Sequence, residues 1–551
     1  MISFLKKYLA LIAIVVLAFF LRFYNITSIP PSLNWDEVSI GYNAYSILKT
    51  GKDEWGVKFP VHFKAYGEYK LPVQIYASIP GIAIFGLNEI GVRITPAIYG
   101  TLTVLLLYFL VMELFKNKWV ALGSSFFLAI SPWHIQLTRA SFESSFAVMW
   151  IVLGIWWLVK GFEKPKWLIL SVIPFTISVY TYNSARVFTP LFLALVALIY
   201  RKRFLAMKKE SVIFAFLFFV LLLPLIPFIL SGEASARYKL VSITDDAGLI
   251  PRIEERRNLS KLPLTLTKLI HNRYTYNTLY FTENYIAHFT PNFLFINGAG
   301  HKQHHVQGVG ELYWIQAPFL LFGLYLLIKR KDESLKILLP WLFLAFVPVS
   351  MTNDSIPNAL RTLIAVPVYQ IFTAIGIYEF FQKTKSKQLK IVLLVSVTVL
   401  LFGLNFGIYL KKYYIDYPIN YSRDWQYGNK QVVNYIKSHY NDYDLIVFSR
   451  HYGEPHMFTL FFTGWDPGKF QNDPNLNRFE TYDWVRVLRF DKFYFPDLGD
   501  IGTKFADIRK ENPGKKILFI GKPRDFPDSL PRLLTVDFLN GNRAFEIVKV
   551  E

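Results

Sequence analysis

The stretch Asn34-Trp35-Asp36-Glu37 follows the first apolar segment of the chain, which runs over about residues 4–24. Two adjacent carboxylates therefore stand where the chain has just left a hydrophobic run long enough to cross a bilayer. Further apolar segments follow for nearly four hundred residues. An ionised side chain at membrane depth costs free energy unless it is paired or used, so this stretch marks a candidate site.

The composition places the chain among membrane proteins. Of its 551 residues, 53% are hydrophobic and 17% aromatic, which is far more apolar than one soluble domain. Cysteine is absent, which excludes disulfides, thiolate metal sites and a cysteine nucleophile. The net charge of +20 lies largely in short loops between apolar runs, as the positive-inside rule describes, so nucleic acid is not an expected partner.

Apolar runs of suitable length predict a polytopic, all-α bundle of about 11 transmembrane helices. They lie near residues 4–24, 90–114, 119–133, 143–161, 166–183, 186–200, 211–231, 312–328, 335–351, 361–381 and 390–410. With the N-terminus inside, every inner loop is basic, whereas the short outer loops hold one arginine each. This alternation predicts a multi-pass protein of the plasma (inner) membrane with a cytoplasmic N-terminus and an extracytoplasmic C-terminus.

Three larger segments are expected outside the membrane. Residues 25–89 hold the Asp-Glu pair, and Glu37–Leu48 has the spacing of an amphipathic helix at the interface. Residues 232–311 mix charges, aromatics and histidines. The tail alternates helical spacing with short strand-like runs, which predicts a small α/β domain. The predicted domains are therefore a transmembrane catalytic module, 1–410, and an extracytoplasmic domain, 411–551.

Three carboxylates are candidate catalytic residues, and each has a structural alternative. An Asp just before a helix is a common N-cap, and spacing alone leaves cap and catalyst equally open for Asp36. Glu37 points about 100° away around a helix, so the two adjacent acids are not expected to do the same job. Glu143 begins an apolar span, where the helix dipole favours an acid.

Five cations lie at or near the outer ends of predicted spans: Lys70, Arg93, Arg139, Arg186 and Arg361. Any one of them is explained by snorkelling to the lipid headgroups. Several at one depth, where the positive-inside bias disfavours them, indicate an anionic ligand. A phosphate fits, because Arg binds it through two parallel hydrogen bonds and Lys as a point charge.

Histidines cluster in the second outer segment, at His301, His304 and His305. Their spacing leaves a divalent metal open, but no HExxH or other strong metal motif supports one. Histidine-rich outer loops are often simply solvated, and no cofactor is otherwise expected. Hydrolysis by a Ser/His/Asp triad has no support, since the sequence lacks a GxSxG elbow.

The order of these motifs resembles the N-terminal module of the GT-C superfamily of membrane glycosyltransferases. It is similar in particular to protein O-mannosyltransferases and aminoarabinose transferases, including bacterial family 39-like members. The likeness covers about residues 1–410. It rests on Asn34-Trp35-Asp36-Glu37, Lys70-Leu71-Pro72, Arg93, Ser131-Pro132 with Arg139 and Glu143, Tyr180 to Pro190 around Arg186, and Arg361-Thr362-Leu363. A multi-span helical bundle with two juxtamembrane helices in the first outer loop is the fold that this resemblance implies.

The resemblance also implies an activity. The enzyme would transfer a sugar, expected to be a hexose such as mannose, from a polyprenyl-phosphate carrier to a hydroxyl on a protein, lipid or glycan acceptor. Asp36 matches the family's catalytic acidic position, Lys70 the lysine that contacts the carrier phosphate, and Glu143 a second acidic position. The arginines match as phosphate ligands. The family's Lys-Pro-Pro is Lys-Leu-Pro here, which leaves the local geometry open.

The chemistry agrees with these residues. A lipid phosphate leaves as a stabilised anion, so the site needs cations aimed at the phosphate and one carboxylate to take the acceptor's proton. We therefore predict a single displacement that inverts the sugar carbon. An O-antigen or oligosaccharide ligase is the enzymatic alternative. A lipid-linked sugar transporter or flippase is the non-enzymatic one, and it would place ionisable groups at mid-membrane rather than at span ends.

Overall fold

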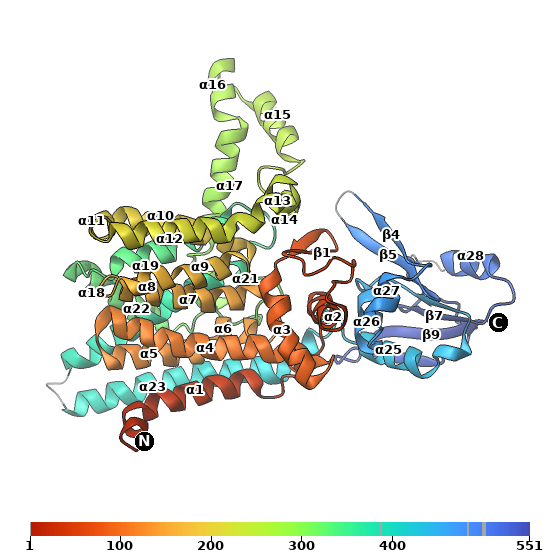
Figure 1. Cartoon of the computed structure of the whole chain (residues 1–551), viewed down its shortest axis with the longest axis horizontal. Helices are drawn as coiled ribbons and strands as arrows, with labels where there is room; N and C mark the ends of the chain where they lie inside the picture. Colours follow the sequence, from red (N-terminus) through yellow and green to blue (C-terminus); the bar gives the residue numbers. More distant parts are fainter. Residues whose placement is uncertain (1, 385–387, 482–483, 499–502, 551) are drawn as a thin grey trace. The chain divides into compact units, whose positions relative to one another are not determined.

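The structure is a computed structural model that describes residues 2–384, 388–481, 484–498 and 503–550. Figure 1 shows many helices and one larger sheet, which lies in the C-terminal part of the chain. The chain divides into two compact units. The helical unit comprises Met1–Arg22, Ala97–Thr138 and Phe142–Tyr409; the mixed unit comprises Phe23–Pro96, Arg139–Ser141 and Leu410–Glu551.

These compact units differ from the predicted domains in one respect. The first outer segment and three residues around Ala140 pack with the tail and not with the helices that surround them in the sequence. The division into a catalytic module, 1–410, and a domain, 411–551, stays a prediction.

Helices make up nearly all of the helical unit. They are α1 (Ile2–Phe23), α5 (Lys118–Ala129), α6 (Pro132–Leu137), α7 (Glu143–Gly161), α8 (Lys166–Leu170), α9 (Val172–Val179), α10 (Asn183–Ile199), α11 (Arg201–Ala206), α12 (Lys208–Leu222), α13 (Ile226–Leu230), α14 (Ala236–Val241), α15 (Leu249–Leu259), α16 (Leu264–Ile270), α17 (Arg273–Ala287), α18 (Gln316–Arg330), α19 (Leu335–Leu344), α20 (Val347–Ser350), α21 (Ala359–Thr362), α22 (Val366–Thr384) and α23 (Gln388–Lys411). The long helix α4 (Glu89–Phe115) begins in the mixed unit and enters the helical unit at Ala97.

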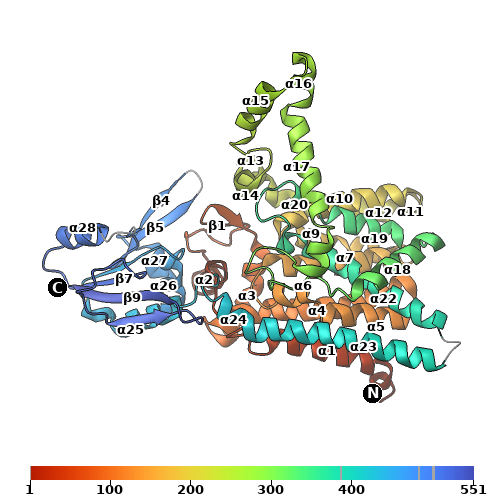
Figure 2. The same ribbon diagram turned by 180° about the vertical axis from the view of Figure 1, so that it is seen from behind.

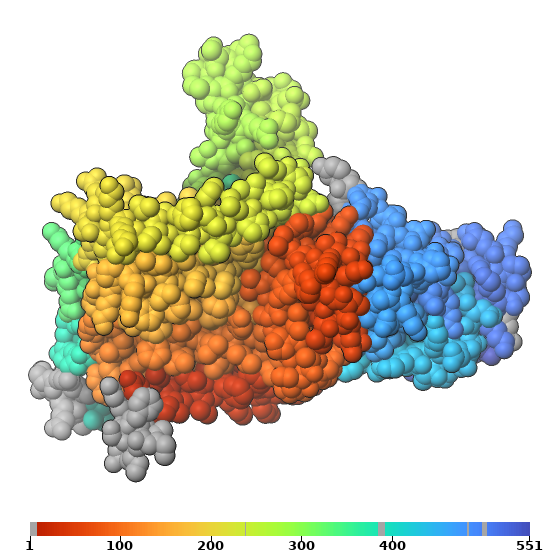
Figure 3. All heavy atoms as spheres, in the orientation of Figure 1, coloured from red at the N-terminus to blue at the C-terminus, as the bar shows by residue number. Residues whose placement is uncertain are grey.

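Several of these helices have the length and composition of membrane spans. Among the described residues, five are long and apolar enough: Glu89–Phe115, Glu143–Gly161, Lys208–Leu230, Ala359–Lys383 and Val392–Asn420. Shorter apolar helices accompany them, such as Tyr8–Phe23 and Asn183–Ile199. On the surface of the helical unit, α12 exposes apolar side chains such as Phe216 and Phe219, as a lipid-facing helix does (Figure 3). A multi-pass helical membrane protein is confirmed, and the number of about eleven spans stays a prediction.

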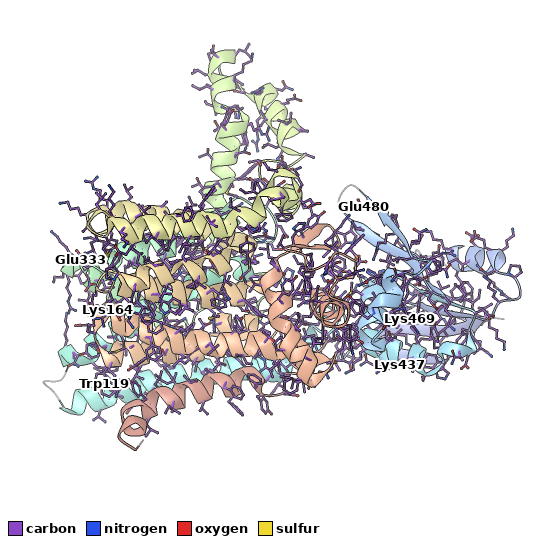
Figure 4. All side chains as sticks on the ribbon, in the orientation of Figure 1. Trp119, Lys164, Glu333, Lys437, Lys469 and Glu480 are labelled. Atoms are coloured by element: carbon purple, nitrogen blue, oxygen red, sulfur yellow. The ribbon has the colours of Figure 1, made fainter. Side chains whose placement is uncertain are left out.

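The loops predicted on the inner side gather at one end of the helical unit. Figure 4 shows Trp119, at the start of α5, at that end together with Lys164 and Glu333, which lie in the loops after α7 and α18. The Tyr200 hydroxyl, beside a fourth basic loop, donates to the carbonyl oxygen of Glu333 at 3.2 Å. The basic loops thus share one side, as the charge pattern predicts.

The segment α15–α17 stands clear of the other helices of its unit. Figures 1 and 2 both show it running crosswise to the long helices α4, α5 and α23. Its base is fixed where Asn284 Nδ2 donates to the carbonyl oxygen of Thr352 at 2.7 Å and Tyr285 Oη to that of Phe343 at 3.0 Å.

A seven-stranded sheet forms the centre of the mixed unit, with strand order β4-β5-β6-β3-β7-β9-β8. The strands are β3 (Leu445–Phe448), β4 (Asn477–Glu480), β5 (Val485–Phe490), β6 (Phe493–Tyr494), β7 (Ile517–Gly521), β8 (Leu534–Asp537) and β9 (Arg543–Val550). The helices of the tail are α24 (Tyr417–Asn420), α25 (Asn429–Ser438), α26 (Pro455–Thr463), α27 (Pro467–Gln471) and α28 (Thr503–Glu511). β3 pairs parallel with β6 and β7, and the other pairs are antiparallel.

The first outer segment adds α2 (Trp35–Thr50), the hairpin β1 (Phe63–Ala65) and β2 (Glu68–Lys70), and α3 (Pro72–Phe85) to this unit. α2 packs directly on α26, because Gly41 leaves room for the ring of Phe461; a Cβ there would lie 2.5 Å from that ring. Ten residues between Glu37 and Ile47 are buried, on every side of the helix. A helix over Glu37–Leu48 is confirmed, but its predicted amphipathic character is wrong, since protein covers the face expected to be polar. Its place at the membrane interface stays a prediction.

Two glycines allow a close contact between α18 and α22 in the helical unit. A Cβ on Gly376 of α22 would lie 1.8 Å from the carbonyl oxygen of Phe319 in α18, and one on Gly323 would lie 2.0 Å from that of Phe372. Close backbone approach through small residues is a common way for helices to associate in membranes.

We expect Gly376→Ala to lower the thermal unfolding midpoint of the purified protein in detergent, because the new methyl group forces α18 and α22 apart at a cost of about 1–3 kcal/mol. Gly407→Ala is the matched control, since a Cβ at that position of α23 meets nothing within 4 Å. Equal unfolding midpoints for the two variants would contradict the close contact.

Candidate functional site

Asn34, and not Asp36, caps the helix that carries the two acids. Its Oδ1 accepts from the backbone N–H of Glu37 at 2.9 Å, and Glu37 Oε2 accepts from the backbone N–H of Asn34 at 3.3 Å. This reciprocal pair is a capping box, and it satisfies two orphan donors of the first turn. Of the two alternatives open for Asp36, the N-cap is wrong, so its carboxylate is not needed to start α2.

Asp36 forms an ion pair with Lys70, the lysine predicted to contact the carrier phosphate. Lys70 Nζ lies 2.5 Å from Asp36 Oδ1, and the indole Nε1–H of Trp35 donates to Asp36 Oδ2 at 3.2 Å. The Lys70 side chain is 3% exposed, and the Asp36 side chain is 32% exposed. A buried ammonium therefore holds a carboxylate whose other side is open. Such a carboxylate can accept a proton from a hydroxyl group that approaches from solvent.

Glu37 has a different environment from its neighbour. Arg93 donates to it twice, Nε to Oε1 and Nη2 to Oε2, both at 2.9 Å. The backbone N–H of Ser141 adds a third donor to Oε1 at 3.1 Å. Both side chains of the ion pair are 0% exposed. With both oxygens engaged and no exposed surface, Glu37 positions the start of α2 and offers no open oxygen to a substrate.

Two of the predicted phosphate ligands instead hold the segment that leads to α2. Arg93 Nη1 donates to the carbonyl oxygens of Ile26 and Pro30, at 3.0 and 2.8 Å. Arg139 Nη2 donates to the carbonyl oxygen of Ile29 at 2.8 Å. Each guanidinium is 0% exposed. Both arginines thus fix the backbone before Asp36, and neither faces solvent.

The tail completes the surroundings of Trp35, the residue before Asp36. Gln426 Oε1 accepts from the backbone N–H of Trp35 at 2.8 Å. Gly453 has a φ of +118°, and a Cβ there would lie 2.5 Å from the Trp35 ring. The ring of Trp484 lies 6.0 Å from that of Trp35 and stacks on Tyr66 at 5.8 Å. The tail therefore supplies packing and one hydrogen bond beside the candidate base.

Three predicted site residues lie in the helical unit. Glu143 is the first residue of α7, where the dipole favours an acid. Arg361 pairs with Asp354, Nη2 to Oδ2 at 2.6 Å. Arg186, in the first turns of α10, has its guanidinium 5.0 Å over the ring of Phe228. Its Nε and Nη2 are buried and have no hydrogen-bond partner among the described residues. Buried donors are nearly always satisfied, so Arg186 is the cation of this set most suited to an added anion.

The histidines of the second outer segment do not converge on one point. The rings of His301 and His304 stack at 3.7 Å, whereas His305 Nδ1 lies 2.9 Å from Glu311 Oε1. Burial alone would lower the pKa of His305, but the Glu311 carboxylate raises it above the usual value. In the ranges that the structure describes, no three His, Cys, Asp or Glu side chains lie close enough to hold a metal. The divalent metal left open at His301, His304 and His305 has no ligand set there.

Comparison with known proteins agrees with the fold. Residues 12–237 match the family model described as dolichyl-phosphate-mannose-protein mannosyltransferase. A stretch of 140 residues is 30% identical to dolichyl-phosphooligosaccharide-protein glycotransferase 2 of Pyrococcus horikoshii, and it covers 24% of this chain and 18% of that protein.

Solved structures are similar over most of the chain. The apo structure of ArnT from Cupriavidus metallidurans has a TM-score of 0.55 at 11% identity, covering 99% of this chain and 98% of that one. The Archaeoglobus fulgidus oligosaccharyltransferase tethered to an acceptor peptide has a TM-score of 0.53 at 15% identity, covering 87% and 62%. This chain has the GT-C fold. The predicted resemblance to the GT-C superfamily of membrane glycosyltransferases is thereby confirmed.

The sequence selected both Asp36 and Lys70 as site residues within one outer segment. It did not identify the residues of the tail that contact Trp35. Gln426 and Trp484 lie 391 and 449 positions beyond Trp35 and carry no motif that links them to it. The one available signal was Gly453, because a glycine among bulky residues marks a close approach of backbone.

We expect Glu37→Gln to lower the free energy of unfolding by about 3–5 kcal/mol, because it leaves the buried Arg93 without its counter-charge. Lys64→Gln is the matched control in the same unit, since Lys64 pairs with Glu480 at the surface, where an ion pair contributes about 0–1 kcal/mol. Denaturant unfolding of the purified variants measures both. If Glu37→Gln unfolds no more easily than the control, the ion pair does not hold this segment.

Proposed function

We propose that the protein transfers a sugar from a polyprenyl-phosphate carrier to an acceptor hydroxyl, on the extracytoplasmic face of the plasma (inner) membrane. The observation that carries the proposal is the partly exposed carboxylate of Asp36 held by the buried ammonium of Lys70. The family match over residues 12–237 supports a lipid-linked donor. So does the likeness to ArnT, which has been solved bound to undecaprenyl phosphate (TM-score 0.51, 12% identity).

In this mechanism Asp36 is the general base. The acceptor oxygen attacks the anomeric carbon as its proton passes to Asp36, and the bond from that carbon to the carrier phosphate breaks. The phosphate leaves with the electron pair as an anion, so no acid is required on that side. Lys70 orients the Asp36 carboxylate through their ion pair. Inversion follows from a single displacement, and the enclosure of Glu37 by Arg93 supports it, because the adjacent acid is not open to form a covalent intermediate.

Arg186 is the first candidate for the carrier phosphate. Two of its guanidinium nitrogens are buried and without a partner among the described residues, and a guanidinium matches a phosphate through two parallel hydrogen bonds. Arg361, which pairs with Asp354, is a second candidate for the phosphate. Glu143, at the start of α7, is proposed only as a second acidic residue of the site. The donor sugar is proposed to be a hexose such as mannose, and the acceptor a protein, because the matching family model is described in those words.

An oligosaccharide donor is the second candidate. The relative from Pyrococcus horikoshii is named for a phosphooligosaccharide donor, and it is 30% identical over 140 residues. Assaying monosaccharide and oligosaccharide forms of the same polyprenyl-phosphate carrier separates the two.

We expect Asp36→Asn to lower the rate of sugar transfer by about a hundred- to ten-thousandfold, since an amide cannot take the acceptor proton. Asp528→Asn is the matched control, because that carboxylate is fully exposed in the tail. The assay uses purified enzyme, polyprenyl-phosphate mannose and a peptide acceptor. Donor binding by Asp36→Asn should stay unchanged. Transfer at the wild-type rate by Asp36→Asn would remove Asp36 from its role.

We expect Arg186→Gln to raise the KM for the lipid-linked donor by about ten- to hundredfold, because a charge-assisted pair of hydrogen bonds to the phosphate is lost. Arg203→Gln is the matched control, since the Arg203 guanidinium also lies over an aromatic ring, 5.2 Å from Phe162, but in a loop predicted to face the cytoplasm. Donor titrations at fixed acceptor concentration measure the effect, and equal donor KM values for both variants would count against phosphate binding by Arg186.

A further inference from the structure

The order in which the chain adds strands to the seven-stranded sheet reverses at β3, because β6 and β7 lie on opposite sides of it. The chain leaves β3 through α26, α27 and the strands β4 and β5, and it returns as β6 on one side of β3. It then passes through α28 and returns as β7 on the other side. β3, β6 and β7 run parallel, so their carboxyl ends lie at one edge.

The two connections leave toward opposite faces of the sheet. Ile446 and Phe448 of β3 share a core with Phe461 of α26. The alternate β3 residues, Leu445 and Val447, share a separate core with α28. In open α/β sheets, ligands bind outside the carboxyl ends of the two strands whose connections part in this way. For this sheet, where the chain goes from β3 to β6 on one side and then to β7 on the other, those strands are β3 and β7.

Arg450 stands at that point. Its backbone N–H donates to the carbonyl oxygen of Pro496 at 3.1 Å, which ties the end of β3 to the end of β6. The guanidinium lies 5.6 Å over the ring of Phe479. Its Nε and Nη1 are buried and have no hydrogen-bond partner in the part of the chain that the structure describes. These two nitrogens lie on different sides of the guanidinium, so each can donate one charge-assisted hydrogen bond to a carboxylate or phosphate oxygen.

The charges around Arg450 favour an added anion. Burial and then the neighbouring Arg486 lower the pKa of the Arg450 guanidinium below its usual value, against Asp497 and Glu454. Glu454 is already engaged, because Trp484 Nε1 donates to it at 2.6 Å and His456 Nδ1 lies 3.4 Å away. An added anion would further relieve the repulsion between the two arginines.

We propose that Arg450, with Arg486 beside it, binds a carboxylate or phosphate group of the acceptor molecule. The identity of that molecule as the acceptor rests on the proposed function. The loop after β3 connects the two places, because Gly453, three residues after Arg450, packs against the ring of Trp35. Three residues span at most about 11 Å. An acceptor whose hydroxyl reaches Asp36 can therefore extend a charged group to Arg450.

The test measures anion binding by the full-length protein in detergent, with no sugar donor present. Inorganic phosphate and acetate are titrated separately at constant ionic strength, with chloride as the balancing salt, and the thermal unfolding midpoint is followed. We expect the midpoint of the wild type to rise with phosphate or acetate, and the more effective anion identifies the preferred group. Arg450→Gln should weaken the response about ten- to hundredfold, and Arg450→Lys should keep part of it as a point charge.

Arg489→Gln is the matched control, because the Arg489 guanidinium stacks on Tyr494 at 4.1 Å on the same sheet. It should respond like the wild type. An unchanged response of Arg450→Gln overturns the proposal, and if that variant does not fold, an unchanged response of Arg486→Gln does so. Asp36→Asn should respond to anions like the wild type, so a failure of the transfer assay leaves this measurement intact.

Discussion

A fully buried ion pair between Glu37 and Arg93 is the constraint on which the rest of the site depends. Removing two charges from water is costly, and their attraction offsets that cost only where the remaining donors and acceptors are also satisfied. Here the Glu37 carboxylate accepts two hydrogen bonds from Arg93 and one from the backbone N–H of Ser141. The remaining Arg93 donors reach backbone carbonyls of the segment before α2. This ion pair thus joins the segment Ile26–Glu37 to Arg93 and to Ser141. Losing some of these contacts would leave a buried charge unpaired, which is less stable than having no buried charge there.

The same constraint divides the work between two adjacent acids. Residues one position apart on a helix point about 100° apart, so they can have unrelated surroundings. Glu37 turns inward to a guanidinium and is closed to solvent, whereas Asp36 turns to the ammonium of Lys70 and stays 32% exposed. In enzymes, two carboxylates take different roles when their surroundings differ in this way. In the proposed mechanism Asp36 is therefore the reacting acid, whereas Glu37 has a structural role.

Sequence alone could predict what local pattern encodes. The length of the apolar runs predicted a membrane protein, and the charge alternation predicted that the basic loops share one side. Asp36 and Lys70 were both selected as site residues in one outer segment, where they form an ion pair. The sequence could not assign the arginines. A lone arginine at a span end looks the same whether it binds phosphate, as proposed for Arg186, or backbone carbonyls, as Arg93 does. Partners that lie 56 residues away, as Glu37 and Arg93 do, leave no spacing signal.

The packing of α2 also bears on the choice between an enzyme and a carrier. A transporter needs broken helices or bundles that rock between two arrangements around its site. α2 is instead capped by Asn34, tied at its first turn by the buried ion pair and covered by α26 of the tail, where Gly41 meets the ring of Phe461. Moving it would expose Glu37 and Arg93 or leave them unpaired. A base that must lie within hydrogen-bond reach of a hydroxyl benefits from that rigidity, whereas a moving gate would work against it.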